Sequence, residues 1–440
     1  MAPGPSVAPG SSVAPGPTIR ERAVIRPPRG GPGQDQSPSE GAKRKAFSSR
    51  WFYASIASGS LGMAMTAPIT ALYAKALGAS DSLAALIVSS MFASFLCMDL
   101  LCSRVVPRVN VRHALVGGYL VFGVGSFVTA VSPNLTLMTG ARVLQGLAVA
   151  FIVGAGFHTA LRLASAGREG REIARFNSCS FFGMTIGPLI VGAVASIAGG
   201  LTGMRWGFAV CGVVNVATAL VARFALPSMP VAARPEFGLP RLQVFQGWRT
   251  RSALAAAGLG FGLRSAAGMT LLPLLGHSLG ASVQEVAAAT MCMSVSEMGG
   301  ILLSGRLADR LGRRPVVVIS ACLSVFALLI ALVDLPLLGY FLLSTAMGFV
   351  MSAVRVVPVA MIVDVAATKE AAAIGWRLAC DVSSLLTAAV TGAMLGLAGL
   401  AGGFAYAAVI AAVVGVLALV IGETRRTLPP QPAASAHMTT

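Results

Sequence analysis

Long apolar stretches, separated by short polar connections, recur from residue 51 to residue 422. Each is close to or above the roughly 20 residues that a helix needs to cross the hydrocarbon core of a bilayer. The pattern therefore predicts an all-α membrane protein with twelve transmembrane helices. Their expected bounds are 51–76, 82–102, 113–132, 135–161, 175–198, 205–226, 252–276, 283–304, 315–334, 336–364, 371–397 and 402–422.

The connections between these segments differ in charge. Those that follow even-numbered segments carry most of the internal arginines, whereas those that follow odd-numbered segments hold Lys75 and Arg205. Basic residues are enriched on the cytoplasmic side of membrane proteins. We therefore expect a multi-pass protein of the cell membrane, meaning a bacterial inner or plasma membrane, with both termini and the even-numbered connections cytoplasmic.

Composition agrees with this interpretation. Of the 440 residues, 55% are apolar and 11% are charged, and the mean hydropathy is +0.79. Soluble domains carry about a quarter charged residues, so a soluble enzyme is disfavoured. The net charge of +17 does not indicate nucleic acid, because the basic side chains gather at predicted membrane boundaries. The seven cysteines lie inside apolar segments without metal-ligand spacing, so we expect no metal site.

The apolar part of the chain repeats itself at an offset of 202 residues. Leu77–Ser80 (L-G-A-S) recurs as Leu279–Ser282, and Gly146 aligns with Gly348. Two such six-helix repeats are an arrangement found in secondary transporters, so we expect two pseudo-symmetric halves. The predicted parts are a disordered Pro/Gly-rich basic cytoplasmic tail (1–46), an N-terminal six-helix bundle (47–226), a cytoplasmic linker (227–251), a C-terminal six-helix bundle (252–424) and a cytoplasmic tail (425–440).

A basic turn, Gly305–Arg314, joins the eighth and ninth segments and has the sequence G-R-L-A-D-R-L-G-R-R. Its one acid, Asp309, can form charge-assisted hydrogen bonds with the surrounding guanidiniums. The first half holds a degenerate copy, in which Pro107 takes the position of Asp309. The residues of interest in the two turns are Gly305, Asp309, Arg310, Gly312, Arg313 and Arg314, and Arg104, Arg108 and Arg112.

Twelve spans, the repeat and three motifs resemble the major facilitator superfamily. The basic turn resembles that family's loop motif, G-x-L-x-D-R-x-G-R-R. The second motif, R-x-x-Q-G, is matched in span 4 by Arg142, Gln145 and Gly146. The third, the G-x-x-x-G-P motif of drug–proton antiporters, is matched in span 5 by Gly183, Gly187, Pro188 and, beyond it, Gly192. The resemblance covers about residues 51–425 and implies a proton-coupled efflux permease.

The resemblance implies a role for each motif. Asp309 would belong to a gating latch that stabilises one access state and breaks in the other. Arg142 would tune the protonation of a nearby acid, although spans 1 and 4 contain no evident carboxylate. The span 5 motif would favour export and prevent proton leak. The residues alone permit simpler roles, namely a topology signal for the loop and close helix packing for the glycines with Pro188.

Ionisable residues inside the predicted spans are the candidates for coupling and substrate binding, because such groups are costly in a membrane and face a partner or a cavity. The acids are Glu297, Asp381 and Asp99, and the bases are Arg142, Arg264, Arg355 and Arg377. Glu297 is the first candidate for the proton site, with Arg264 on the preceding span as a potential partner, and Asp381 is the second. Arg377 and Asp381 are four residues apart, which predicts a local ion pair. The excess of arginines favours an anionic or zwitterionic substrate.

Three functions fit these observations. The first is proton-coupled export of a small organic molecule, such as a drug, antibiotic or metabolite, by alternating access. The second is uptake of a nutrient or organic anion by symport, and the third is a membrane sensor or scaffold that does not transport. The sequence contains no phosphate-binding loop or nucleophile–base arrangement, so we expect neither enzyme chemistry nor a cofactor. The expected partners of the monomer are its substrate, protons and the lipid bilayer.

Overall fold

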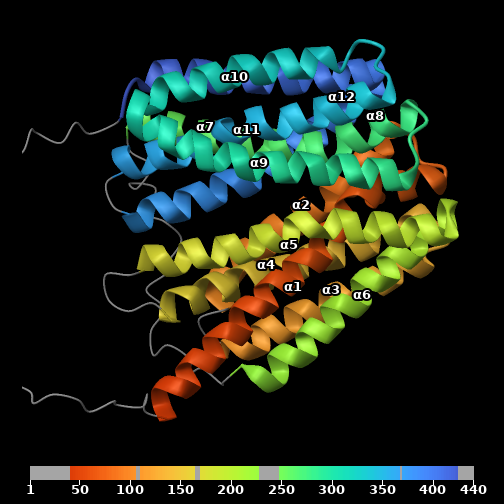
Figure 1. The fold of residues 1–440 in the computed structure, drawn as a ribbon, viewed down its shortest axis with the longest axis vertical. Helices are drawn as coiled ribbons and strands as arrows, with labels where there is room; N and C mark the ends of the chain where they lie inside the picture. Colours follow the sequence, from red (N-terminus) through yellow and green to blue (C-terminus); the bar gives the residue numbers. More distant parts are fainter. Residues whose placement is uncertain (1–39, 106–109, 164–168, 227–246, 367–368, 425–440) are drawn as a thin grey trace, which may run out of the picture. The chain divides into compact units, whose positions relative to one another are not determined.

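Figure 1 shows the computed structural model, which describes residues 40–105, 110–163, 169–226, 247–366 and 369–424. All secondary structure in these ranges is helical. The helices are α1 (Glu40–Ala76), α2 (Asp81–Val105), α3 (Val111–Val131), α4 (Leu135–Leu163), α5 (Glu169–Ala198), α6 (Gly200–Ala225), α7 (Trp248–Ala266), the π-helix η3 (Ala267–Leu271), α8 (Leu272–Ser278), α9 (Val283–Leu311), α10 (Arg313–Ile330), α11 (Leu337–Val365) and α12 (Lys369–Ile421).

Ten helical stretches among the described residues are long and apolar enough to cross a membrane. One of them, Gly375–Ile421, contains a break at Ala398 and Gly399 that separates the eleventh and twelfth predicted spans. The ten stretches therefore cover eleven of the twelve predicted spans. The remaining span lies in α1, which is helical throughout but is not one of these ten stretches, because its serines, threonines and glycines lower its hydropathy.

Several predicted segments lie outside the described residues. They are residues 1–39 of the predicted tail, 227–246 of the linker and the C-terminal residues 425–440. One difference is visible at the boundary, because α1 begins at Glu40, inside the segment 1–46 that we predicted to be disordered. The stretch E-G-A-K-R-K-A consists mainly of good helix formers, which accounts for this extension.

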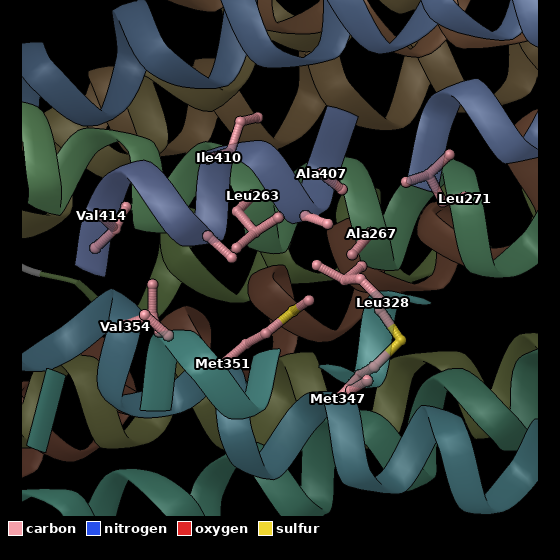
Figure 2. Close-up of a cluster of buried hydrophobic side chains, with 14 of the residues drawn as sticks. Leu263, Ala267, Leu271, Leu328, Met347, Met351, Val354, Ala407, Ile410 and Val414 are labelled. Carbon is pink, nitrogen blue, oxygen red and sulfur yellow. The ribbon is translucent and has the colours of Figure 1, made fainter. Parts of the chain in front are cut away.

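Two hydrophobic clusters form the interior. One is built almost entirely from α1 to α6 and contains Tyr73, Tyr119 and Phe208, all fully buried. The other is built mainly from α7 to α12, where α7 packs against α12 and α9 packs against α11. Figure 2 shows part of this second cluster, to which α7 contributes Leu263, α11 contributes Met351 and α12 contributes Ile410. The helices thus form two groups that follow chain order.

The predicted repeat is visible in two equivalent turns. Gly78 and Gly280 both have a left-handed backbone, with φ of 93° and 77°, which glycine adopts without steric strain. Three backbone hydrogen bonds are common to the two turns, and their donors and acceptors correspond at an offset of 202 residues. The side chain of Ser80 then caps α2, as that of Ser282 caps α9. The same local sequence therefore ends one helix and starts the next in both halves of the chain.

The two groups of helices meet mainly where α2 packs against α12 and where α5 packs against α9. Small residues allow both contacts. A Cβ atom added to Gly192 of α5 would lie 2.5 Å from Cβ of Ala287 of α9. A Cβ atom at Gly396 of α12 would lie 3.2 Å from Oγ of Ser82 of α2. These contacts bring charged residues from distant parts of the sequence together.

Candidate functional site

Glycines on α7 determine how closely its neighbours approach. A Cβ atom at Gly258 would lie 2.6 Å from the carbonyl oxygen of Ala379 of α12, and one at Gly262 would lie 2.8 Å from that of Ser383. On another face, a Cβ atom at Gly260 would lie 3.2 Å from Cα of Arg355 of α11. Side chains of larger residues would hold these helices apart. The glycines therefore bring α7 close to both α11 and α12.

Glu297 of α9 lies between two arginines that come from the neighbouring helices. Arg264 of α7 donates from Nε to Oε2 of Glu297 over 2.7 Å, and Arg355 of α11 donates from Nη1 to Oε1. All three residues are largely buried, Glu297 being 5% exposed. The contact between Arg264 and Glu297 confirms the predicted pairing. The second arginine was predicted only as an intramembrane cation, and its addition gives the group a formal charge of +1.

Two aromatic rings hold the guanidinium of Arg355. Its Cζ atom lies 5.1 Å from the ring centroid of Phe181 of α5 and 5.5 Å from that of Phe261 of α7, both within the range of a cation–π contact. Phe181 belongs to the N-terminal group of helices, so Arg355 contacts both groups. Sequence reasoning missed both phenylalanines, because nothing distinguishes them from the other apolar residues of their spans.

A second charged group lies where α2 meets α12. Arg377 of α12 forms an ion pair with Asp99 of α2, and Asp381 of α12 also lies against Asp99. The predicted local ion pair between Arg377 and Asp381 is therefore wrong, since the guanidinium reaches across to the other group of helices. Asp381 is 5% exposed, and its Oδ2 atom has no hydrogen-bond partner among the described residues. Two carboxylates and one guanidinium give this group a formal charge of −1.

Arg142 is buried inside the N-terminal group of helices and is 2% exposed. Its Nη1 atom donates to Oε1 of Gln145 over 2.7 Å, and Gln145 donates in turn to Oγ of Ser126 over 3.0 Å. The Nε atom has no partner among the described residues, which also provide no carboxylate in an ion pair with Arg142. The acid that Arg142 was expected to act on is therefore not among its described partners. The R-x-x-Q spacing instead places the amide of Gln145 beside Arg142, because residues three apart share a helix face.

The glycines of the span 4 and span 5 motifs lie at close helix contacts. A Cβ atom at Gly146 of α4 would lie 3.0 Å from the carbonyl carbon of Met91 of α2. A Cβ atom at Gly183 of α5 would lie 2.7 Å from the backbone nitrogen of Leu61 of α1, and one at Gly187 would lie 2.6 Å from the carbonyl oxygen of the same residue. Pro188 lies inside α5, where it removes one helical hydrogen bond. These contacts confirm the predicted packing role.

The basic turn is held by contacts that differ from the predicted ones. Asp309 is exposed and forms no ion pair among the described residues. The carboxylate at the start of α10 is instead that of Glu423, which accepts hydrogen bonds from the backbone nitrogens of Arg313 (3.1 Å) and Arg314 (3.2 Å). Arg313 also forms an ion pair with Asp364 of α11. The turn is therefore fixed by residues that follow α10 in the chain.

Within the turn, the backbone requires glycine at Gly312 but not at Gly305. Gly312 has a left-handed backbone with φ of 101°, so glycine is required there. A Cβ atom added to Gly305 would have no neighbour within 4 Å, so close packing does not require glycine there. In the first-half copy, Arg112 donates to the carbonyl oxygen of Arg223. Arg104 and Arg108 lie outside the residues whose side chains the structure describes.

Comparisons with known proteins agree with this architecture. The chain matches the family description Major Facilitator Superfamily over residues 52–265 and 252–438. It has the fold of a bacterial homolog of the human lysosomal transporter Spinster, with TM-scores of 0.64 and 0.67 to its unoccupied and occupied inward-facing structures, at 14% and 13% identity. These alignments cover 88% and 86% of this chain and 96% of the other chain in both cases.

Two curated relatives match shorter regions. The multidrug resistance protein B homolog of Mycobacterium tuberculosis is 30% identical over 130 residues, which is 30% of this chain and 23% of the relative. An uncharacterised MFS-type transporter of Methanocaldococcus jannaschii is 26% identical over 175 residues, which is 38% of this chain and 42% of the relative. The match thus spans less than half of either relative. The family match over most of the chain shows that this protein belongs to the major facilitator superfamily, a family of secondary transporters of small molecules and not of enzymes.

Proposed function

We propose that this transporter couples proton movement to the export of a small organic molecule by alternating access. The observation that carries the proposal is the group formed by Asp99, Arg377 and Asp381 where α2 meets α12. It joins the two groups of helices, and its formal charge changes from −1 to zero when it takes up one proton. A proton can therefore change the strength of a contact between the parts that move.

This geometry reverses our order of candidates for the proton site. Both oxygens of Glu297 accept from guanidiniums, so a proton there would leave Arg264 and Arg355 without a counter-charge in a buried position. Asp381 has one oxygen without a partner among the described residues. A proton on Asp381 would leave Arg377 paired with Asp99. We therefore propose Asp381, together with Asp99, as the proton site.

Export is supported by the motif in α5 and by a relative. Gly183 and Gly187 hold α5 against α1, in the pattern that resembles drug–proton antiporters. The relative from Mycobacterium tuberculosis is named as a multidrug resistance protein homolog, although the match covers 23% of it. We also propose that the basic ends of the helices face the cytoplasm, that both termini lie there, and that residues 47–226 and 252–424 act as the two moving halves of a monomer.

The group of Arg264, Glu297 and Arg355 favours one alternative, the uptake of an organic anion by symport. Its formal charge of +1 suits an anion, and protonation of Glu297 would free both arginines for such a substrate. This arrangement would move the proton and the anion together. The two functions differ in direction, which a transport assay can measure.

The test begins with a deletion strain and an overexpressing strain, whose intracellular levels of antibiotics and metabolites are compared. Export predicts that a substrate accumulates in the deletion strain and is depleted in the overexpressing strain. Compounds that meet this criterion are added to inverted membrane vesicles that carry a pH gradient and a pH-sensitive dye. We expect them to dissipate the gradient. Greater accumulation in the overexpressing strain would support uptake instead, and transport without proton movement would contradict coupling.

A further inference from the structure

We propose that Arg264 and Arg355 bind the carboxylate of an organic anion, and that Phe181 and Phe261 form the apolar surface beside it. This inference rests on the proposed transport function and names the class of substrate. It does not depend on the direction of transport or on which acid carries the proton.

The first argument is charge. Among the described residues, Glu297 is the acceptor for one N–H group of Arg264 and one of Arg355, and each guanidinium carries five such groups. Burying a cation without a counter-ion costs several kcal/mol, roughly, unless a partner compensates. One carboxylate compensates one of the two arginines. The remaining positive charge suits a ligand that brings its own negative charge.

The second argument is the way in which the two arginines are held. The rings of Phe181 and Phe261 lie beside the guanidinium of Arg355, and a guanidinium can stack on aromatic rings while its N–H groups bind an acceptor. The π-helix η3 begins three residues after Arg264, and a Cβ atom at Gly268 of η3 would clash with Nη1 of Arg264. Short π-helical turns inside α-helices occur frequently at functional sites. The absence of a side chain at Gly268 therefore leaves the space that the Arg264 guanidinium occupies.

The third argument is Glu297 itself, because its carboxylate shows which chemical group fits between the arginines. One of its oxygens accepts from Arg264 and the other from Arg355. A substrate carboxylate offers the same two acceptors and would compete with Glu297 for the same donors. The phenylalanines beside Arg355 favour an anion with an apolar body over a fully hydrated inorganic anion.

The fourth argument is position. Phe181 belongs to α5, whereas Arg264, Glu297 and Arg355 belong to α7, α9 and α11. The group thus includes side chains from both groups of helices, close to where α5 contacts α9. A ligand bound here would touch both parts, as a transporter that works by relative movement of its halves requires.

The test uses three probes that share one ring system and differ in charge, namely 2-naphthoate, 2-naphthylmethanol and 2-naphthylmethylammonium. Binding to the full-length protein in lipid nanodiscs is measured without a proton gradient, so a failure of coupling leaves the result unchanged. We expect 2-naphthoate to bind more tightly than the other two probes and than inorganic phosphate. The variants R264Q and R355Q should each weaken its binding about tenfold to a hundredfold, the range expected for a lost hydrogen bond to a charged group.

Matched variants separate binding from folding. R205Q replaces an arginine of α6 whose Nε donates to the hydroxyl of Tyr73 of α1 and which has no described contact with Arg264, Glu297 or Arg355. It should leave 2-naphthoate binding unchanged. R264K and R355K keep the charge and should retain part of the affinity, and thermal unfolding shows whether each variant is folded. E297Q removes the competing carboxylate and should strengthen binding.

Three results would overturn the assignment. The first is preferential binding of the ammonium probe that is lost in E297Q, which would make this a cation site. The second is 2-naphthoate affinity that is the same in folded R264Q, R264K, R355Q and R355K as in the wild type. The third is the absence of 2-naphthoate binding up to millimolar concentrations.

Discussion

Replacing Gly146 by alanine should destabilise the protein, although alanine is the better helix former. Gly146 lies on α4 at its contact with α2, where a Cβ atom would clash with Oγ of Ser94 and with the backbone of Met91, whose carbonyl carbon would be 3.0 Å away. The serine side chain can rotate, but the backbone of α2 can move away only if the whole helix shifts. The added methyl group therefore forces α2 and α4 apart.

The magnitude follows from two opposing effects. Glycine to alanine inside a helix stabilises by about 0.5–1 kcal/mol when there is room for the methyl group. Overpacking costs about 1–3 kcal/mol, and the rigid backbone neighbour places Gly146 at the upper end of that range. We expect G146A to lose about 2–2.5 kcal/mol of stability after the helix gain is subtracted. Gly140 on the same helix has nothing within 4 Å of an added Cβ atom, so G140A should be neutral or stabilising.

The assay is reversible unfolding in a mixed-micelle SDS titration, with G140A as the matched control and G348A as the equivalent change in the second half. A Cβ atom at Gly348 of α11 would lie 2.8 Å from the carbonyl carbon of Met293 of α9, so G348A should lose a similar amount. Equal stability of G146A and G140A would refute the reasoning. A loss in G146A without one in G348A would refute the structural equivalence of the two positions.

Two further predictions concern the basic turn and the arginine pair. E423Q removes the negative charge at the start of α10 and should cost about 0.3–1 kcal/mol of stability. D309N should change stability less, because Asp309 forms no ion pair among the described residues. The same SDS titration measures both variants, and a larger loss in D309N would support the predicted latch at Asp309. G268A should displace the guanidinium of Arg264 and weaken 2-naphthoate binding with little change in stability, since the flexible arginine side chain can move aside. In the control G299A, the added Cβ atom has no neighbour within 4 Å, so this variant should bind 2-naphthoate as the wild type does. Equal affinity in the two variants would contradict the role of Gly268.

Local features of the sequence were sufficient to predict most of the fold. The length of an apolar stretch predicts a membrane span wherever the helix is uniformly apolar. It also predicted the span in α1, despite the serines that lower the hydropathy of this helix. The repeated L-G-A-S predicts the same turn twice, because a glycine with positive φ and a capping serine act within a few residues of each other. The pairing of Arg142 with Gln145 is local in the same sense, although we did not predict it from the R-x-x-Q motif.

The contacts between distant helices were not predictable in this way. Spacing of four residues favours a pair between Arg377 and Asp381, but α2 supplies Asp99, 278 residues away, and the tertiary contact prevails. For the same reason, the sequence did not predict that Phe181 lies beside Arg355 or that Glu423 lies at the start of α10. Each depends on which helices pack together, and helix periodicity alone does not determine the neighbours of a face.

The most direct test of coupling through Asp381 compares two kinds of transport in proteoliposomes, using a substrate identified by the export screen. Transport driven by a proton gradient requires protonation and deprotonation, whereas exchange of labelled for unlabelled substrate at equal pH requires only binding and alternation. D381N should abolish gradient-driven transport and retain exchange, and the exposed-site control D334N should retain both. Gradient-driven transport at the wild-type rate in D381N would contradict the assignment of the proton site to this residue.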